Sequence, residues 1–158
     1  MKILGIQCER VVINARDRRG RDTGPWLIRW AINTPLGGVK LHKILRSDED
    51  RDLHGHPWSF MSIILRGGYW EHVAVQPADD PKNDLRYWSG RPITDRTWFG
   101  PGSILWRRAP SPHRLELPEG QTAWTLVFTS RKKRTWGFRT VCGFIPWYRY
   151  DDAKAEGC

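Results

Sequence analysis

The stretch DLHGHPWSFMSIILRGGYWEH, residues 52–72, joins two closely spaced histidines to an apolar run and a glycine pair. On an extended chain, residues i and i+2 face the same side about 6.6 Å apart. The imidazoles of His54 and His56 can therefore reach one point. The apolar run has the composition of a buried strand, and Gly67-Gly68 predicts a turn at its end. The stretch indicates a β-structure with two metal-competent histidines at its mouth.

The rest of the chain repeats this alternation of short apolar runs and turn residues. Proline and glycine occur together in the segments NTPLGG, FGPGS and LPEGQ, and helical periodicity is hard to find. Many short strands of similar length predict an all-β sandwich or barrel. The predicted strands cover 2–7, 25–32, 38–45, 59–66, 69–75, 85–88, 103–108, 113–117, 122–129 and 136–141.

The length of 158 residues fits one domain. We therefore expect a single domain over residues 1–158. The polar, arginine-rich segment 16–25 is expected to be a mobile loop, and the polar tail 151–158 is expected to fray.

The cellular location of the protein and the redox state of its cysteines can be predicted from motifs that are absent from the sequence. It has no apolar run long enough to cross a membrane, and its N-terminus turns polar too soon for a signal peptide. We expect a soluble, cytoplasmic protein that does not enter membranes. Cys8, Cys142 and Cys158 are odd in number and lack Cys-x-x-Cys spacing, which predicts free thiols.

The chain is basic, with 26 Lys and Arg against 17 Asp and Glu and a formal net charge of +9. Such a surface attracts anions over roughly a Debye length, which makes nucleic acid an alternative partner. No helix-turn-helix, zinc-finger or RNP-like pattern accompanies the charge, so this alternative is not favoured. The basic clusters at 16–21, 106–108 and 130–136 also fit solvated loops and protected strand edges.

Two histidines alone leave a metal site incomplete, so a third ligand has to come from elsewhere. His113 is the best candidate, because it follows a Gly-Pro-Gly turn and a strand that would bring it back across a barrel. His42 and His72 are weaker candidates, since a lone histidine is more often a hydrogen-bonded core or surface residue. We predict that His54, His56 and His113 hold a metal.

HGHPWSFMSIILRGG, followed later by PGSILWRRAPSPH, resembles the two motifs of the cupin superfamily. The first motif has the form H-x-H and then glycine, and the second has the form P-G and then histidine. The resemblance implies a double-stranded β-helix, in which two antiparallel sheets form a small barrel around a divalent metal. His54, His56 and His113 stand at the matching positions, and the two motifs span residues 52–117.

The sequence departs from the usual cupin pattern at one place. Typical cupins carry a metal-binding glutamate a few residues after the second histidine, where this chain has Phe60 or Met61. The resemblance is therefore to a three-histidine variant, similar to the ferrous sites of thiol dioxygenases and related cupin dioxygenases. Residue 56 is histidine rather than aspartate, which disfavours a 2-oxoglutarate cosubstrate. The resemblance favours Fe(II), while three neutral nitrogens equally fit zinc, manganese or nickel.

Two acidic residues lie near the motifs. If His113 points inward, Leu115 and Leu117 do too, and Glu116 points out. Glu71 follows the glycine pair, and the sequence does not fix its direction. It is a candidate additional metal ligand, with a solvated strand carboxylate as the alternative.

A metal with open positions also needs groups that orient a substrate. Arginines next to His113 could hold a carboxylate or phosphate through two parallel hydrogen bonds, although surface arginines on a strand edge are the alternative. Aromatic residues near the motifs could wall the cavity, although they are more often core. The candidate substrate-binding residues are Arg108, Arg114, Tyr69 and Trp106.

These observations support three hypotheses for function. The leading one is a metal-dependent cupin, an Fe(II) oxygenase of the dioxygenase type that acts on a small anionic substrate. The first alternative is a non-catalytic cupin that binds or senses a small ligand, and the second is a nucleic-acid-associated protein. Because N-terminal strand exchange is common in cupins, segment 2–12 also suggests a homodimer.

Overall fold

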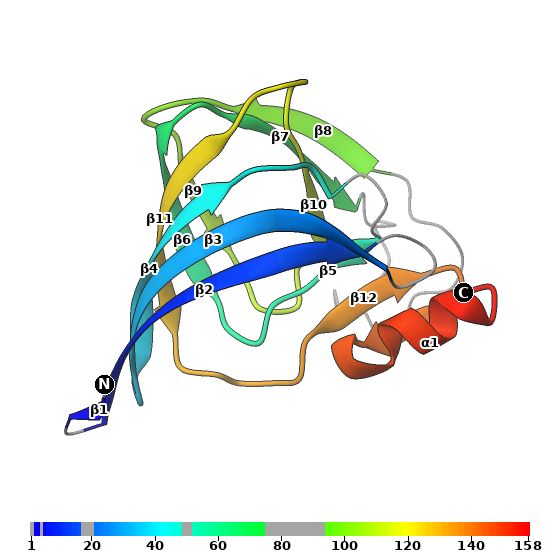
Figure 1. Ribbon diagram of the computed structural model, residues 1–158, viewed down its shortest axis with the longest axis horizontal. Coiled ribbons are helices and arrows are strands. Elements are labelled where there is room, and N and C mark those ends of the chain that lie inside the picture. The colour runs from blue at the N-terminus through cyan, green and yellow to red at the C-terminus, as the bar shows by residue number, and fades with distance from the viewer. Residues whose placement is uncertain (1, 4, 17–20, 49–51, 75–93) are drawn as a thin grey trace.

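The computed structural model describes residues 2–3, 5–16, 21–48, 52–74 and 94–158. Two antiparallel sheets make up most of it, and the one α-helix in these ranges is α1, Tyr150–Ala155 (Figure 1). The predicted all-β fold is confirmed. Within the described residues, no helix is long and apolar enough to cross a membrane.

In the described residues, the larger sheet has seven strands in the order β1-β2-β3-β4-β11-β6-β9. Strand β11 lies between β4 and β6, so segments far apart in the sequence are neighbours. The strands are β1 Lys2–Ile3, β2 Ile6–Arg16, β3 Asp22–Thr34, β4 Gly37–Ile44, β6 Phe60–Arg66, β9 Ile104–Arg107 and β11 Ala123–Ser130.

The smaller sheet has six strands within the described part of the chain, in the order β13-β12-β5-β10-β7-β8. The very short β5 pairs with both β10 and β12, which places the H-x-H segment between two later parts of the chain. The strands are β5 Leu53–His54, β7 Tyr69–Ala74, β8 Thr94–Phe99, β10 His113–Glu116, β12 Gly137–Thr140 and β13 Gly143–Pro146.

The turn predicted at the glycine pair joins β6 to β7. Gly67 has φ of 73°, a left-handed conformation that favours glycine. A Cβ at Gly67 would also collide with the carbonyl oxygen of Thr122 on the neighbouring chain segment. The sequence therefore needs glycine here to pass from the larger sheet to the smaller one.

Side-chain alternation gives the larger sheet two different faces. Cross-strand register aligns Ile32, Val39, Phe128, Met61 and Trp106 in one row, and several of these side chains are exposed. This row lies on the outer face. Residues that alternate with it point into the barrel, as strand geometry requires.

The inner face supplies the core and the wall of a cavity. The row Ala31, Lys40, Val127, Ser62 and Leu105 is aligned by the same register, and all five residues are buried. Further along these strands and on the opposite sheet, a hydrophobic cluster closes the barrel: Leu27, Ile44, Ile64, Tyr69, Leu105, Leu117 and Ala123.

Several strand predictions differ from the structure in their limits. Strand β2 continues to Arg16, well beyond the predicted end at residue 7, because it pairs with β3 over that length. Strands β8 and β13 were not predicted, since TDRTWF and GFIP have little strand-like alternation. The predicted strand 85–88 lies outside the described residues.

The segment 16–25, predicted to be a loop, is partly strand in the structure. Arg16 closes β2, and β3 already begins at Asp22. The hydrogen bond from the Asn14 side chain to the Asp22 carboxylate joins the two strands there. Residues 17–20 lie outside the described part of the chain.

The C-terminal tail is helical rather than frayed. Asp151 and Asp152 lie in the first turn of α1, where carboxylates are favoured by the helix dipole. Tyr150 and Ala153 are buried on one side of the helix, and the Tyr150 ring stacks on Phe138 of β12 with centroids 3.7 Å apart. This packing corrects the prediction that 151–158 frays.

The prediction of three free thiols is wrong for two of the cysteines. Cys142 and Cys158 form a disulfide, and Cys8 is free and exposed. Sequence spacing could not show this pair, because the fold of α1 brings the C-terminus back to the β12–β13 turn. Disulfides are rare in the cytosol, so the cytoplasmic location remains a prediction without the support of free thiols.

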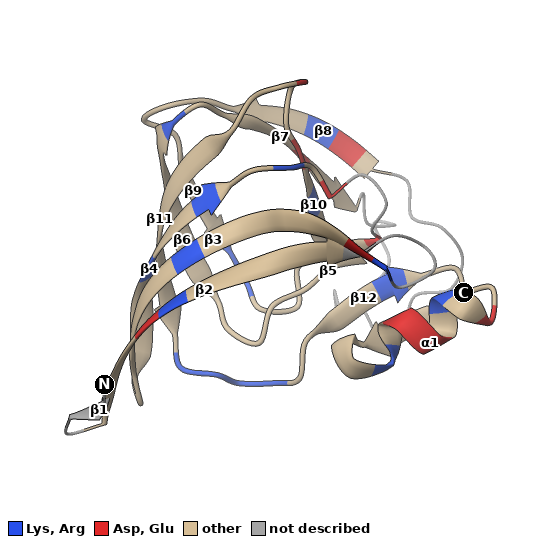
Figure 2. Cartoon of the chain, viewed as in Figure 1, with Lys and Arg blue, Asp and Glu red and all other residues tan. Residues whose placement is uncertain are grey.

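Basic residues occur on strands of both sheets, with a continuous run in the connection between β11 and β12 (Figure 2). That run contains residues 131–134, and most of them are exposed. Nucleic-acid association stays a prediction. The expected homodimer does too, although β1 is already paired with β2 of its own chain.

Candidate metal centre

Three histidines meet at the mouth of the barrel. His54 is the last residue of β5, His56 follows two positions later, and His113 opens β10 directly opposite His54 in the register. One ligand nitrogen from each of them can be chosen so that all lie within 4.8 Å of one another. The structure therefore brings together the three residues that the motifs predict.

The two closest donors are the Nε2 atoms of His56 and His113, which lie 2.8 Å apart. Two nitrogens bound at about 2.1 Å to one ion and at a right angle would be about 3.0 Å apart. In the metal-free protein, the same separation fits a hydrogen bond between two neutral imidazoles. The donor set thus suits adjacent positions on one divalent ion.

Glu71 orients His113 from behind. His113 Nδ1 donates to Glu71 Oε1 at 2.6 Å, and Arg107 Nε donates to the same oxygen at 3.1 Å. Arg107 Nη2 also contacts Glu71 Oε2. With the Nδ1 proton on the carboxylate side, the Nε2 lone pair of His113 faces the other histidines, as a metal ligand requires.

The carboxylate of Glu71 is 1% exposed and ionised. Burial alone would raise its pKa, but hydrogen bonds and charge from His113 and Arg107 outweigh burial and lower the pKa to about 2. Both oxygens of Glu71, the candidate additional ligand, are engaged by His113 or Arg107. The group of potential ligands in the described residues contains the three histidines without Glu71.

Metal binding needs neutral imidazole, and burial favours this form at His56. Burial is the main cause that lowers the pKa of His56 well below its usual value, and positive charge on His113 and His54 acts in the same direction. Protonation of this group would place like charges side by side. The site is therefore poised to accept a cation other than a proton.

Phe60 is one of the two residues that the motif resemblance sets where typical cupins have glutamate. Its side chain is buried, and its ring centroid lies 4.8 Å from that of His56 and 5.8 Å from that of His113. Met61 is on the outer row of the larger sheet. Of the two residues considered, Phe60 is therefore the one that faces the histidines, and it gives the site an apolar wall.

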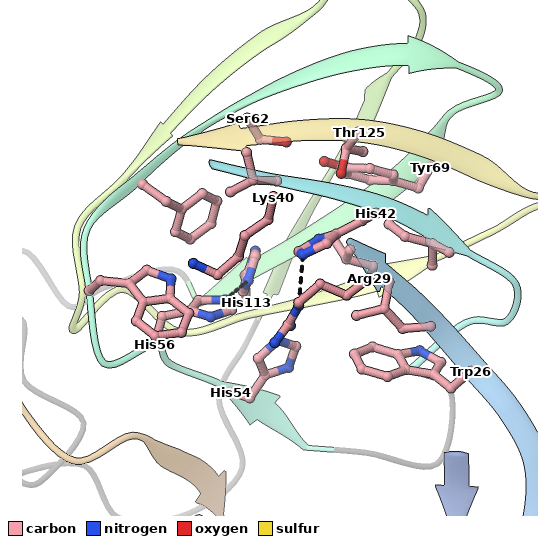
Figure 3. Close-up of a pocket in the computed structure, with 16 residues that line it drawn as sticks. Trp26, Arg29, Lys40, His42, His54, His56, Ser62, Tyr69, His113 and Thr125 are labelled. Atoms are coloured by element: carbon pink, nitrogen blue, oxygen red, sulfur yellow. Dashed lines mark hydrogen bonds between the residues drawn. The ribbon is translucent and has the colours of Figure 1, made fainter. Parts of the chain in front are cut away.

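A cavity opens beside the histidines (Figure 3). Its empty volume, counted together with the part open to solvent, is about 630 Å³. None of the described residues that line the cavity is acidic. The lining residues are Trp26, Leu27, Arg29, Lys40, His42, Ile44, His54, His56, Trp58, Phe60, Ser62, Tyr69, His113, Leu115, Thr125 and Val127.

Two cationic residues line this cavity without having been predicted as site residues, Arg29 and Lys40. Both lie on inner faces, on β3 and β4, next to the weak ligand candidate His42. Arg29 Nε donates to His42 Nε2 at 3.0 Å. Burial and nearby positive charge lower the pKa of His42 to about 3, so it is a neutral acceptor. The sequence did contain a signal for Lys40: it alternates with His42 and Ile44 on one strand, so all three side chains point to the same face.

Of the predicted substrate-binding residues, Tyr69 lines the cavity, and burial raises the pKa of its hydroxyl. The other three do not line it. Trp106 is 64% exposed in the outer row, and Arg108 shares that side. Arg114 alternates with the inward His113 and therefore faces outward. Strand parity thus corrects these three predictions, and it is Arg107 that reaches inward, to Glu71.

The parity prediction for Glu116 is confirmed. Its carboxylate lies on the side of β10 opposite to His113, where it hydrogen-bonds His72 at 2.7 Å and Arg96 at 2.6 Å. His72 is therefore engaged away from the metal centre. Glu116 and His72 form a carboxylate–imidazole pair like Glu71 and His113, but the Glu116 carboxylate is partly exposed whereas that of Glu71 is buried.

No protein-family model and no curated protein sequence matches this chain. Solved structures match it in fold. A crystal structure of FeII HppE has a TM-score of 0.53 at 13% identity, over 77% of this chain and 56% of that one. Hydroxypropylphosphonic acid epoxidase from S. wedmorenis has a TM-score of 0.50 at 10% identity, over 77% and 55%.

A point mutant of Bacillus subtilis oxalate decarboxylase has a TM-score of 0.51 at 11% identity, over 81% of this chain and 29% of that one. The chain thus spans little more than half the length of the first of these proteins and less of the last. At such low identity the likeness bears on fold alone. These neighbours are cupin-fold proteins, and the chain has the double-stranded β-helix of that fold.

Proposed function

We propose that this protein is a metal-dependent cupin that binds a divalent ion, Fe(II), and acts as an oxygenase on a small anionic substrate. The observation that carries the proposal is the convergence of His54, His56 and His113 within 4.8 Å at the cavity. The orientation of His113 by a buried carboxylate adds to it, because second partners of this kind accompany metal-bound histidines.

The donor set supports an open coordination sphere. Three neutral nitrogens occupy one side, and Phe60 stands where a carboxylate would otherwise complete the site. A bound ferrous ion would supply open positions for ligands and one-electron chemistry with O2. Support for iron comes from the FeII structures of HppE, while a structural neighbour with Mn(II) centres, oxalate decarboxylase, keeps manganese as the alternative beside zinc and nickel.

The residues of this chain have distinct tasks in the proposal. Glu71 holds the Nδ1 proton of His113 and fixes its ring, and Arg107 keeps that carboxylate ionised. Phe60 and the aromatic lining exclude water from one side of the site. The hydroxyl groups of Ser62, Tyr69 and Thr125 offer neutral hydrogen bonds to a substrate.

A non-catalytic cupin that binds or senses a small ligand is the second candidate. It is favoured by the lining itself, since the described residues around the cavity include no carboxylate that could act as a general base. Both candidates use the same cavity. Turnover is what separates them.

The test measures oxygen consumption by protein loaded anaerobically with Fe(II), across a panel of thiols, amino acids and sugar phosphates. The oxygenase predicts uptake with at least one member and product formation that disappears in His113→Ala. The matched control is His72→Ala, which removes a histidine on the outer side of the same sheet and should keep activity. Stoichiometric iron without oxygen uptake for any member would favour the non-catalytic candidate.

A further inference from the structure

Two buried cations share the cavity with the histidines, and their surroundings require an explanation. Lys40 is 3% exposed, and Arg29 is half-buried on the neighbouring strand. Lysine and arginine are almost never buried without a partner of opposite charge. Here the two occur on one wall, and Figure 3 shows both side chains extending toward the histidines.

The partners that hold these cations are neutral. The Lys40 ammonium donates to the Thr129 hydroxyl at 3.0 Å and lies 4.3 Å from the centroid of the Trp58 ring. Arg29 donates through Nε to His42, which is itself uncharged. These contacts position the two groups and leave their charge without direct compensation.

The closest balancing carboxylate belongs to Glu9 on β2. It acts on both cations at a distance, while its oxygens accept hydrogen bonds from Asn33 at 2.9 Å and Gln7 at 3.3 Å. Within the described part of the chain, no carboxylate comes within ion-pair distance of Arg29 or Lys40. Burial lowers the pKa of Lys40 to about 8, assisted by the charge of Arg29, and most of the ammonium is still charged at neutral pH.

We propose that Arg29 and Lys40 form an anion subsite that binds the oxyanionic head group of the substrate and so directs its reacting part to the three histidines. The guanidinium can present two parallel N–H donors to a carboxylate, phosphate or phosphonate, and the ammonium adds a point charge. The bound anion would take the place of the missing countercharge. This inference deepens the proposed function, on which it rests for the identity of the ligand as substrate.

Position within the fold supports this assignment. Arg29 and His42 are directly paired across β3 and β4, and Lys40 lies two residues from His42 on the same inner face. Arg29 and Lys40 line the same cavity as His54, His56 and His113. A small molecule held by the cationic pair would therefore lie against the metal centre.

The experiment titrates inorganic phosphate, acetate and methylphosphonate into the protein and measures binding by calorimetry. It uses metal-free protein and protein loaded with Zn(II), because an anion can also bind to a metal. The variants are Arg29→Met and Lys40→Met, which remove charge and keep much of the length. The matched control is Lys43→Met, on the same strand but on the outer face, where Lys43 lies over Trp124.

The subsite predicts saturable binding of at least one anion to metal-free protein, weakened at least about tenfold in Arg29→Met and in Lys40→Met. Lys43→Met should bind as the wild type does. The preferred anion distinguishes a carboxylate head group from a phosphorus oxyanion. Without anion, neither variant should unfold at a lower temperature, because each loses a charge that has no ion-pair partner among the described residues.

The outcomes separate this inference from the proposed function. Arg29→Met and Lys40→Met should keep full metal stoichiometry, whereas His113→Ala should lose metal and keep anion binding. Equal anion affinity in wild type and both variants, or no saturable binding in either form, would overturn the subsite. If both variants melt at a lower temperature and bind anions normally, the cations serve structure instead.

Discussion

Substitution of Glu71 by glutamine isolates the effect of a buried charge on the metal centre. Glutamine has the same shape and keeps an oxygen that can accept from His113 Nδ1. It removes the negative charge that faces both His113 and Arg107. The His113 ring becomes less basic and less firmly oriented, so Glu71→Gln should bind metal more weakly.

The magnitude follows from two routes. Loss of a second partner to a metal-bound histidine typically lowers metal affinity by about 10- to 100-fold. In the folded protein the pKa of Glu71 falls from 4.5 to about 2, which corresponds to about 3 kcal/mol in favour of the carboxylate. The variant should lose up to this amount of stability at pH 7. The difference from wild type should shrink as pH falls from 4.5 toward 2, because the wild-type carboxylate becomes protonated there.

The assay is a competition titration of Zn(II) between the protein and a chromophoric chelator. Glu116→Gln is the matched control, since Glu116 hydrogen-bonds His72 at 2.7 Å on the outer side of the same strand pair. It should bind zinc as the wild type does. If Glu71→Gln binds zinc within twofold of wild type, the role assigned to this carboxylate is refuted.

Two further predictions concern stability. The pKa of His42 is about 3 in the folded protein and 6.5 in the unfolded chain. As pH falls from 6.5 toward 3, the unfolded chain binds the proton first, so the free energy of unfolding of the wild type falls by about 1.4 kcal/mol per pH unit. His42→Gln should flatten that dependence in denaturant titrations between pH 6 and pH 4.5, and an unchanged slope would contradict the burial of His42. The Cys142–Cys158 disulfide closes a separation of 16 residues, so Cys158→Ala should cost about 3 kcal/mol and speed amide exchange in α1. Wild-type protein treated with a reductant should behave like the variant, and insensitivity of both the melting temperature and the exchange to the reductant would count against the disulfide.

The metal centre was predictable because its information is local. His54 and His56 are two residues apart, and the strand after the Pro-Gly turn, β9, leads to His113, which opens β10 opposite His54. The outward direction of Glu116 follows from the same alternation. When a candidate residue lies on the same strand as a residue of known direction, as Glu116 does with His113, strand alternation alone predicts which face its side chain points to.

The remaining features depend on contacts between distant segments. The direction of Glu71 is set by the turn at Gly67 and by the pairing of β7 with β10. The sequence of β7 alone does not contain this information. Arg29 and Lys40 belong to strands in which either face could be the inner one. Their cross-strand neighbours come from separate parts of the chain, Val11 on β2 for Arg29 and Val127 on β11 for Lys40. The disulfide required the fold of α1 to bring Cys158 to Cys142.

Three of the four predicted substrate-binding residues, Trp106, Arg108 and Arg114, do not line the cavity, for a similar reason. The motif places Trp106 and Arg108 near His113 in sequence, but the register of β9 against β6 aligns Trp106 with the outward Met61. Proximity along the chain therefore selected the outer face. The inward residue of this strand, Arg107, supports Glu71 instead.

The most direct test of the central claim is the metal content of single-histidine variants. Wild-type protein purified anaerobically and analysed by elemental mass spectrometry should contain one divalent ion per chain, with iron favoured. His54→Ala, His56→Ala and His113→Ala should each contain much less, while His42→Ala and His72→Ala should match the wild type. A wild type that takes up no divalent ion, or triad variants that retain it fully, would contradict the three-histidine centre.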